Sequence, residues 1–203
     1  MSLQLKTPQR DIYAQTMKIG VSETNKDASK KKSAVERAVK REVRIAISRS
    51  PAIEALRDGI LKADFGLTID PGPQIVSSVV ESTSVTYKTL TKSGGKILGG
   101  YTITVQPSDY SNLYGLGVSR QSIEGGELPW LNWLLEAGDQ VLIVDFGVEY
   151  GEFGRTGMAH MTEESRPFKV NSTYAGTQSD NFITKALQAN QIQITNAIIK
   201  ALS

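Results

Sequence analysis

The chain has 203 residues and a mass of 22.1 kDa, with 23 basic and 21 acidic side chains, one histidine and no cysteine. This length is sufficient for a hydrophobic core, and the composition excludes disulfides, thiol catalysis and cysteine–zinc sites. The chain shows no apolar run long enough for a membrane span and no secretory signal at its start. We therefore expect a soluble, cytosol-made protein of mixed helix and strand that is not an enzyme.

The net charge of +2 conceals an uneven distribution along the chain. Residues 1–50 carry twelve basic and five acidic side chains, whereas residues 51–203 carry eleven basic and sixteen acidic ones. Within 121–164, nine carboxylates face Arg155 alone. Three interpretations stay open: a nucleic-acid arm, a basic segment that meets the acidic surface of a neighbouring subunit, or two solvated surfaces that never meet.

The first quarter of the chain is predicted to contain an arm and two helices. Residues 1–28 show no stable period, and we expect an extended or mobile N-terminal arm. Residues 29–203 are expected to form a single domain. Apolar side chains recur with helical spacing over 30–48. Ser50 is a natural N-cap and Pro51 fits the first helical position, so a second helix is predicted to follow and to end near 62.

The middle of the chain is predicted to contain a hairpin and a long loop. Residues 74–82 have helical spacing but a high β-branched content, so helix and strand both stay open. Residues 85–91 and 97–106 are predicted to pair across a glycine turn at 92–96. Residues 107–127 form a long loop rich in glycine and serine, and we expect an interface there that uses Tyr110 and Tyr114.

A short helix is expected at 129–137, closed by Gly138. Residues 140–150 alternate most clearly of all and predict the strongest strand. A returning strand at 158–162 and a short third strand at 167–170 complete the sheet.

The chain ends in a predicted amphipathic helix within 180–202, capped by Ser179 or Asp180. Its outer face is rich in amides, including Gln191, and such a face suits either a protein contact or solvent. The predicted fold class is α+β: a small antiparallel sheet of hairpins, packed by a long N-terminal helix and this C-terminal helix.

The chain contains little that could support catalysis. His160 is the only histidine, and a lone histidine on a strand is more often structural than catalytic. Glu163 and Glu164 are adjacent, so they would point apart on any regular element. The glycine pairs lack the spacing of phosphate-binding loops. We therefore predict no metal and no cofactor, and a profile of this kind suits an assembly component.

Several short runs in the second half resemble virion proteins of tailed bacteriophages. These runs are LPWL at 128–131, LEAG at 135–138, GRTGMA at 154–159, RPFKV at 166–170, YAGT at 174–177 and DNFITKAL at 180–187. They are similar to the neck, or tail-completion, proteins that form rings between portal and tail. The resemblance covers roughly 128–190. It implies a long helix packed on a small antiparallel sheet, a helix after the last strand, and no catalytic residues.

The resemblance leads us to expect a non-enzymatic structural subunit of the virion, in a ring at the neck or head–tail connector. Its expected partners are copies of itself and other virion proteins, such as portal or adaptor and tail terminator or tube. DNA would pass through the ring without sequence-specific binding, and no membrane is involved.

We expect the subunit contacts to combine a basic helix face, an acidic hairpin, the long loop at 107–127 and the amide-rich face of the C-terminal helix. The candidate interface residues are Arg37, Lys40, Arg41, Arg44, Glu149, Glu152, Arg155, Tyr110, Tyr114 and Gln191. The alternatives are another virion location (tail terminator, tube or baseplate), a nucleic-acid-binding protein that uses the basic first quarter, and a small hydrolase that uses His160.

Overall fold

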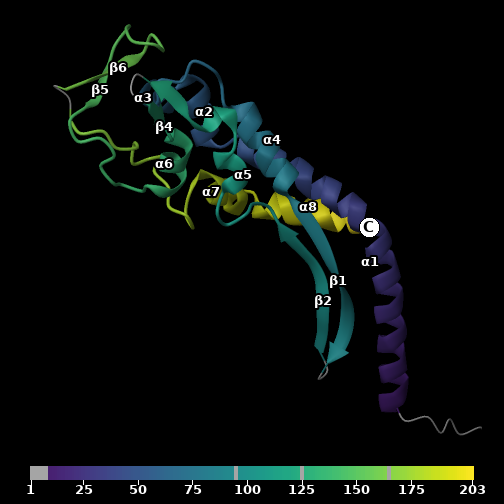
Figure 1. Cartoon of the computed structure of the whole chain (residues 1–203). Helices are drawn as coiled ribbons and strands as arrows, with labels where there is room; N and C mark the ends of the chain where they lie inside the picture. Colours follow the sequence, from purple (N-terminus) through teal and green to yellow (C-terminus); the bar gives the residue numbers. More distant parts are fainter. Residues whose placement is uncertain (1–8, 94–95, 124–125, 164–165) are drawn as a thin grey trace, which may run out of the picture.

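The computed structural model describes residues 9–93, 96–123, 126–163 and 166–203. The predicted α+β class is confirmed, but the hairpins form three separate two-stranded antiparallel sheets instead of one common sheet. Figure 1 shows a compact body at one end of the molecule. The first half of the long helix α1 (Gln9–Ser48) and the hairpin β1–β2 (Ser84–Ser93 and Lys96–Thr104) project from this body side by side.

The N-terminal segment is helical, so the prediction of an extended arm over residues 1–28 is wrong from Gln9 onward. Residues 1–8 lie outside the described residues. No proline interrupts the chain between 9 and 50, and helix propagation costs little once a helix is nucleated. Contacts from the hairpin and from the C-terminus hold the segment around residues 25–31, and these distant partners could not be read from local periodicity.

The second half of α1 forms the centre of the core, as its spacing predicts. Val35, Val39, Val43 and Ile47 recur every fourth residue and are completely buried, so they form one stripe along the helix. Helix α4 (Gly72–Ser82) packs against α1 and resolves the ambiguity at 74–82 in favour of helix.

The predicted start of the second helix is confirmed. The Ser50 hydroxyl accepts a hydrogen bond from the Ile53 amide at 3.4 Å, and Pro51 occupies the first turn. The helix is shorter than expected because Gly59 adopts an extended conformation. It therefore divides into α2 (Pro51–Asp58) and α3 (Ile60–Asp64).

The hairpin β1–β2 is confirmed and contains a bulge. Lys88 lies opposite Gly100 and Thr91 lies opposite Leu98, so β1 has one residue more than β2 between these pairs. Gly99 has a φ of +118°, and a Cβ there would lie 2.5 Å from the Thr89 carbonyl oxygen. This glycine is therefore required by the bulge.

Residues 107–127 contain four short elements where a loop is predicted. They are α5 (Ser111–Tyr114), a 3₁₀ turn (Gly117–Ser119), β3 (Gln121–Ile123) and β4 (Gly126–Leu128), with β3 and β4 antiparallel. Helix α6 (Trp130–Glu136) follows as expected and ends at Gly138, which has a φ of +61°. Trp130 is completely buried and lies 5.4 Å from Phe65, centroid to centroid.

The strongest predicted strand, 140–150, is strand only at its end. β5 (Gly147–Tyr150) pairs with β6 (Ala159–Thr162), whereas Ile143 forms a single bridge with Phe168. The Phe168 amide donates to the carbonyl oxygens of both Ile143 and Phe146, at 2.8 and 2.9 Å. The chain therefore curls around Phe168, and the third strand predicted at 167–170 reduces to that bridge.

The final helix is interrupted at Asn190. α7 (Phe182–Ala189) and α8 (Gln191–Leu202) replace the single predicted helix, and the side-chain amide of Asn190 donates to the Ala186 carbonyl oxygen at 2.9 Å. The N-cap is Asn181 and not Ser179 or Asp180. Figure 1 shows α8 lying along α1 inside the body, as expected for a C-terminal amphipathic helix.

Candidate functional site

The projecting part of the molecule consists of two elements joined by side-chain hydrogen bonds. On α1, the Asn25 amide nitrogen donates to the Leu90 carbonyl oxygen at 3.1 Å, and its oxygen accepts from the Leu90 amide at 2.8 Å. The same oxygen accepts from the Tyr87 hydroxyl at 2.6 Å. Asn25 thus pairs with β1 much as a strand residue would, and it fastens the hairpin to the helix. We call residues 9–32 and the hairpin together the arm.

Aromatic contacts and the C-terminus support the base of the arm. Tyr87 and Tyr101 face each other across the hairpin with ring centroids 4.9 Å apart, and the Tyr101 hydroxyl donates to the Ala28 carbonyl oxygen at 2.5 Å. Lys31 donates to the Leu202 carbonyl oxygen, also at 2.5 Å. The arm is therefore an integral part of the fold, and hydrogen bonds hold it at several points along its length.

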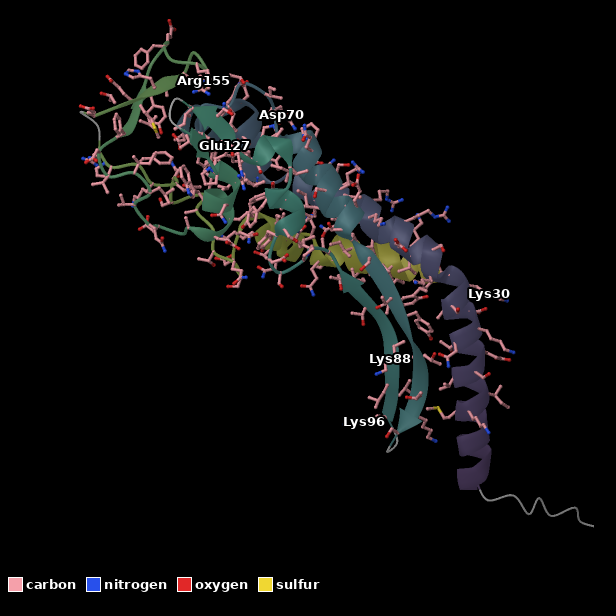
Figure 2. The ribbon with its side chains drawn as sticks, in the orientation of Figure 1. Lys30, Asp70, Lys88, Lys96, Glu127 and Arg155 are labelled. Carbon is pink, nitrogen blue, oxygen red and sulfur yellow. The ribbon has the colours of Figure 1, made fainter. Side chains whose placement is uncertain are left out.

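The arm is basic. Residues 82–108 contain three lysines and no carboxylate, and Lys88 and Lys96 are exposed. Figure 2 shows these two lysines on the hairpin and Lys30 on the neighbouring helix, whereas Glu127 and Arg155 lie in the body.

The predicted basic face lies further along α1, where the helix runs through the body. Arg37, Arg41 and Arg44 are exposed and Lys40 is half-buried. Lys40 pairs with Glu36 at 2.9 Å, and Arg41 pairs with its neighbour Glu42 at 2.9 Å. The face is therefore present, although two of its four cations already have a carboxylate nearby.

The predicted acidic residues come together on the β5–β6 hairpin, at the end of the molecule opposite the arm (Figure 1). Glu149 and Glu152 are exposed, and the Glu149 carboxylate lies 3.7 Å from the His160 imidazole. Arg155 lies in the same hairpin, and its guanidinium donates to the Ser122 carbonyl oxygen at 3.0 Å. The Phe153 ring packs edge-on against His160 with centroids 4.4 Å apart. His160 is therefore part of a surface pair.

Of the two tyrosines predicted as interface residues, Tyr110 lies in the interior and Tyr114 is half-buried. Tyr110 is 4% exposed, and its hydroxyl donates to the Gln178 carbonyl oxygen at 2.9 Å, so the interface prediction for it is wrong. Tyr114 is half-buried, its hydroxyl is enclosed, and burial raises the pKa of that hydroxyl above its ordinary value. A chain of 203 residues needs core side chains even in its loops, which explains both. Gln191 is exposed at the start of α8, as predicted.

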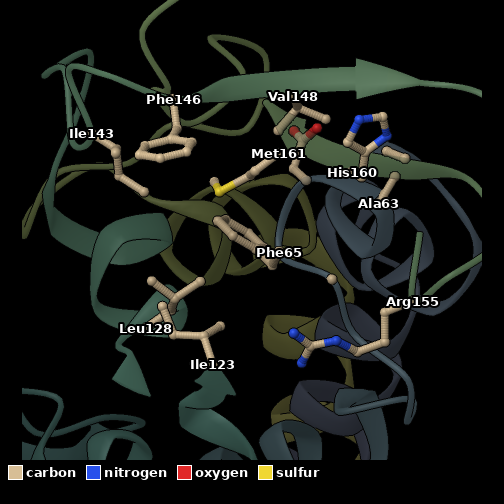
Figure 3. Close-up of a pocket in the computed structure, with 13 residues that line it drawn as sticks. Ala63, Phe65, Ile123, Leu128, Ile143, Phe146, Val148, Arg155, His160 and Met161 are labelled. Atoms are coloured by element: carbon tan, nitrogen blue, oxygen red, sulfur yellow. The ribbon is translucent and has the colours of Figure 1, made fainter. Parts of the chain in front are cut away.

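A cavity of about 620 Å³ opens beside β5–β6, and the sequence analysis did not anticipate it. Figure 3 shows Phe65, Phe146 and Met161 facing this space, with Leu128 and Ile123 on the opposite wall and Arg155 at the edge. Its walls come from α3, β3, β4, β5 and β6, elements far apart in the sequence. In the sequence, the one indication of such a cavity is that apolar side chains are interspersed among the carboxylates of residues 121–164.

Asp64 is a buried carboxyl at the base of this cavity. It is 6% exposed, and its carboxylate accepts from the Tyr150 hydroxyl at 2.5 Å. Burial raises the pKa of Asp64 to about 6, and the hydrogen bond from Tyr150 opposes that rise. The same pairing and burial raise the pKa of Tyr150. The one sign of this burial in the sequence is that the aspartate lies between two apolar residues, Ala63 and Phe65.

Among the described residues, no group of three or more histidine, cysteine or acidic side chains could hold a metal ion. No helix in the described ranges has both the length and the apolar character needed to cross a membrane.

Comparison with protein-family models, curated proteins and solved structures found no match to this chain. The fold and surface therefore define an α+β chain with a projecting basic arm and an acidic, partly apolar opposite end.

Proposed function

We propose that this chain is a non-enzymatic structural subunit of a tailed-phage virion. It would form part of an oligomeric ring in the neck or head–tail connector, with other virion proteins above and below and DNA passing through. The alternative within this class is a tail terminator, tube or baseplate subunit. The short runs over 128–190 that resemble neck proteins support the choice of virion location.

The observation that carries the proposal is the arm. The helix and the hairpin extend together beyond the body, so much of their surface is exposed in an isolated subunit. Ile19, Ile97 and Leu98, all on the arm, are 60%, 47% and 53% exposed. Exposed apolar side chains on a projecting element favour burial against a partner. An assembly subunit supplies such a partner in every neighbour.

The test is the mass of the purified chain in solution, combined with negative-stain imaging. The proposal expects closed rings, or a concentration-dependent oligomer that becomes ring-shaped on assembly. A chain that stays monomeric at all accessible concentrations, and that shows no ring by imaging, would contradict the homo-oligomeric part of the proposal.

Nucleic-acid binding is the second candidate, favoured by the lysines of the arm. Lys30, Lys88 and Lys96 lie on the helix and the hairpin of the arm (Figure 2), and phosphate contacts need such cations. Nine carboxylates in 121–164 oppose it, because they repel a phosphate backbone. We would favour nucleic-acid binding over ring formation if the full chain is retained on duplex DNA and this retention falls steeply as the salt concentration rises.

A further inference from the structure

A second cavity opens where the end of α1, the start of α2 and helix α7 meet, and its volume is about 350 Å³. Each of these helices contributes an alanine to its wall: Ala46 on α1, Ala52 on α2 and Ala186 on α7. Packed helices normally fill the space between them with larger side chains. The alanine side chain is a single carbon, so the space between the helices stays open here. We call it the alanine-lined cavity.

The walls of the alanine-lined cavity are apolar and partly aromatic. Phe182 lines the cavity and is buried, and the half-buried Tyr174 lines it from the segment before α7. Aromatic side chains attract a further aromatic ring through offset or edge-on contacts. The volume lies near the lower end of the range of about 300–1,000 Å³ that is typical of ligand sites, so the space suits a single aromatic ring.

The charged side chains of this cavity are both cations. Arg49 and Lys185 line it, and no carboxylate is among the described residues that do so. Within the described part of the chain, the Arg49 guanidinium has no ion pair and no hydrogen bond. The Lys185 ammonium lies 3.7 Å from the Asp180 carboxylate, but this pair is exposed and hence weak. Both cations are therefore available to a bound anion.

Two hydroxyl groups add further hydrogen-bond donors. Thr173 and Tyr174 both line the cavity, and neither hydroxyl has a hydrogen-bond partner among the residues that the structure describes. Each of them can donate to an oxygen atom of a bound ligand. A small number of polar groups in an otherwise apolar cavity is the usual composition of a small-molecule site.

We propose that the alanine-lined cavity binds a small aromatic anion, namely one aromatic ring that carries a carboxylate or a phosphate group. The aromatic ring packs against Phe182 and Tyr174. The anionic group lies against Arg49, whose guanidinium can form two parallel hydrogen bonds with it, and Lys185 contributes a second positive charge. This inference goes beyond the proposed function and does not rest on assembly into an oligomer, so the two are tested separately.

NMR titration of the purified full chain tests the class of ligand. The probes are phenyl phosphate, phenylacetate, the neutral phenylacetamide, the cationic phenylethylamine, and inorganic phosphate, which has no aromatic ring. We expect one or both aromatic anions to bind, and each of the other probes to bind at least about tenfold more weakly. The tighter of the two anions identifies the charged group of the ligand. Equal binding of any of the other probes overturns the proposal, and so does a chain that binds neither anion.

Substitutions at the cavity locate the bound anion. Arg49→Gln and Lys185→Gln should each weaken its binding about tenfold, because each removes a charged hydrogen-bond donor. The matched control is Arg44→Gln, which changes an exposed arginine of α1 that does not line the cavity. An equal response to Arg49→Gln and Arg44→Gln overturns the proposal.

Filling the cavity gives an independent measurement. Ala189→Phe places a large side chain at the exposed edge of the cavity, and Gln188→Phe places the same side chain at a neighbouring exposed position outside it. We expect the anion to lose its binding in the Ala189 variant alone. Both positions are exposed, so both variants should fold, which circular dichroism checks. Unchanged binding in Ala189→Phe overturns the proposal, whereas the presence or absence of oligomers bears only on the proposed function.

Discussion

Hydrogen bonds of single polar side chains join segments of this molecule that lie far apart in the sequence. Asp64 accepts the Tyr150 hydroxyl at the base of the cavity, and Asn25 bridges α1 to the backbone of β1. A buried polar group contributes stability only while its partners remain, because an unsatisfied group costs more than the bond returns. Both residues therefore lend themselves to substitution experiments.

Asp64 should make the stability of the protein depend on pH. Its pKa is about 6 in the folded chain, against an ordinary value of 3.8. Between these values the folded state binds more protons than the unfolded state, so the free energy of unfolding falls as pH rises from about 4 through 6. Asp64→Asn removes this loss and should stabilise the protein above pH 6, by on the order of 2 kcal/mol.

Urea unfolding of both proteins at a series of pH values measures this difference. The control is Tyr150→Phe, which removes a hydrogen bond that lowers the pKa of Asp64. It should extend the fall in stability to higher pH, because the fall ends at the pKa of Asp64 in the folded chain. A wild-type stability that instead rises over this range, once corrected with Asp64→Asn, would show that Asp64 is not buried in this way.

Asn25 should determine whether the hairpin stays on the helix. Asn25→Ala removes three hydrogen bonds and leaves the Leu90 amide without its partner. We expect a loss of about 1–3 kcal/mol and faster hydrogen exchange at the Leu90 amide. Asn25→Asp keeps the acceptor for Leu90 and Tyr87 and should lose less. Unchanged exchange at Leu90 in the alanine variant would contradict the bridge.

At the level of elements, helix ends decide where the chain turns. Two helix N-termini illustrate unequal caps. Asn181 is completely buried and caps α7 through the amides of Ile183 and Thr184, at 3.1 and 3.3 Å. Ser50 caps α2 through one bond of 3.4 Å. The Asn181 amide nitrogen also donates to the Tyr110 hydroxyl, at 2.6 Å, so this cap joins two segments of the core.

Asn181→Ala should therefore cost more than Ser50→Ala. The first removes a cap and leaves buried partners unsatisfied, for a loss of about 2–4 kcal/mol. The second removes one long bond, for a loss of about 1 kcal/mol or less. Chemical unfolding of the two variants under identical conditions measures the order, and an equal loss would show that the contact with Tyr110 contributes nothing.

At the level of the whole molecule, charge is arranged along its length. The basic arm lies at the end of the molecule opposite the β5–β6 hairpin, which carries the exposed residues Glu149 and Glu152 (Figure 1). Surface charges act over about 10 Å at 0.1 M salt and over about 30 Å at 0.01 M. Their effect should therefore be read in assembly and in its dependence on salt, and not in the stability of the single chain.

Reversing the charge of the basic face should weaken assembly. Arg41→Glu with Arg44→Glu is expected to reduce self-association roughly tenfold at low salt and less at high salt. The matched control, Arg57→Glu with Lys62→Glu, reverses two charges on α2 and α3. Sedimentation at two salt concentrations compares the pairs. If assembly does not respond to the first pair, the electrostatic contribution of this face is rejected.

Local patterns in the sequence were sufficient for the elements whose partners are near in the chain. The stripe over 30–48, the Ser50–Pro51 helix start, the β1–β2 hairpin and the end of α6 at Gly138 could all be predicted. In each case the hydrogen bonds run between residues a few positions apart, or across one turn. Such bonds depend on residue type and spacing, which the sequence displays directly.

Long-range contacts settled the rest. Residues 9–28 are helical beside a hairpin whose Leu90 bonds to Asn25 across 65 positions, the 140–150 segment curls around Phe168, and Tyr110 lies in the core. The cavity beside β5–β6 and the burial of Asp64 likewise need walls from five elements. The composition and charge of these segments were visible from the start. Which surfaces meet, and which side chains are buried as a result, depends on packing between distant segments, and no local period records it.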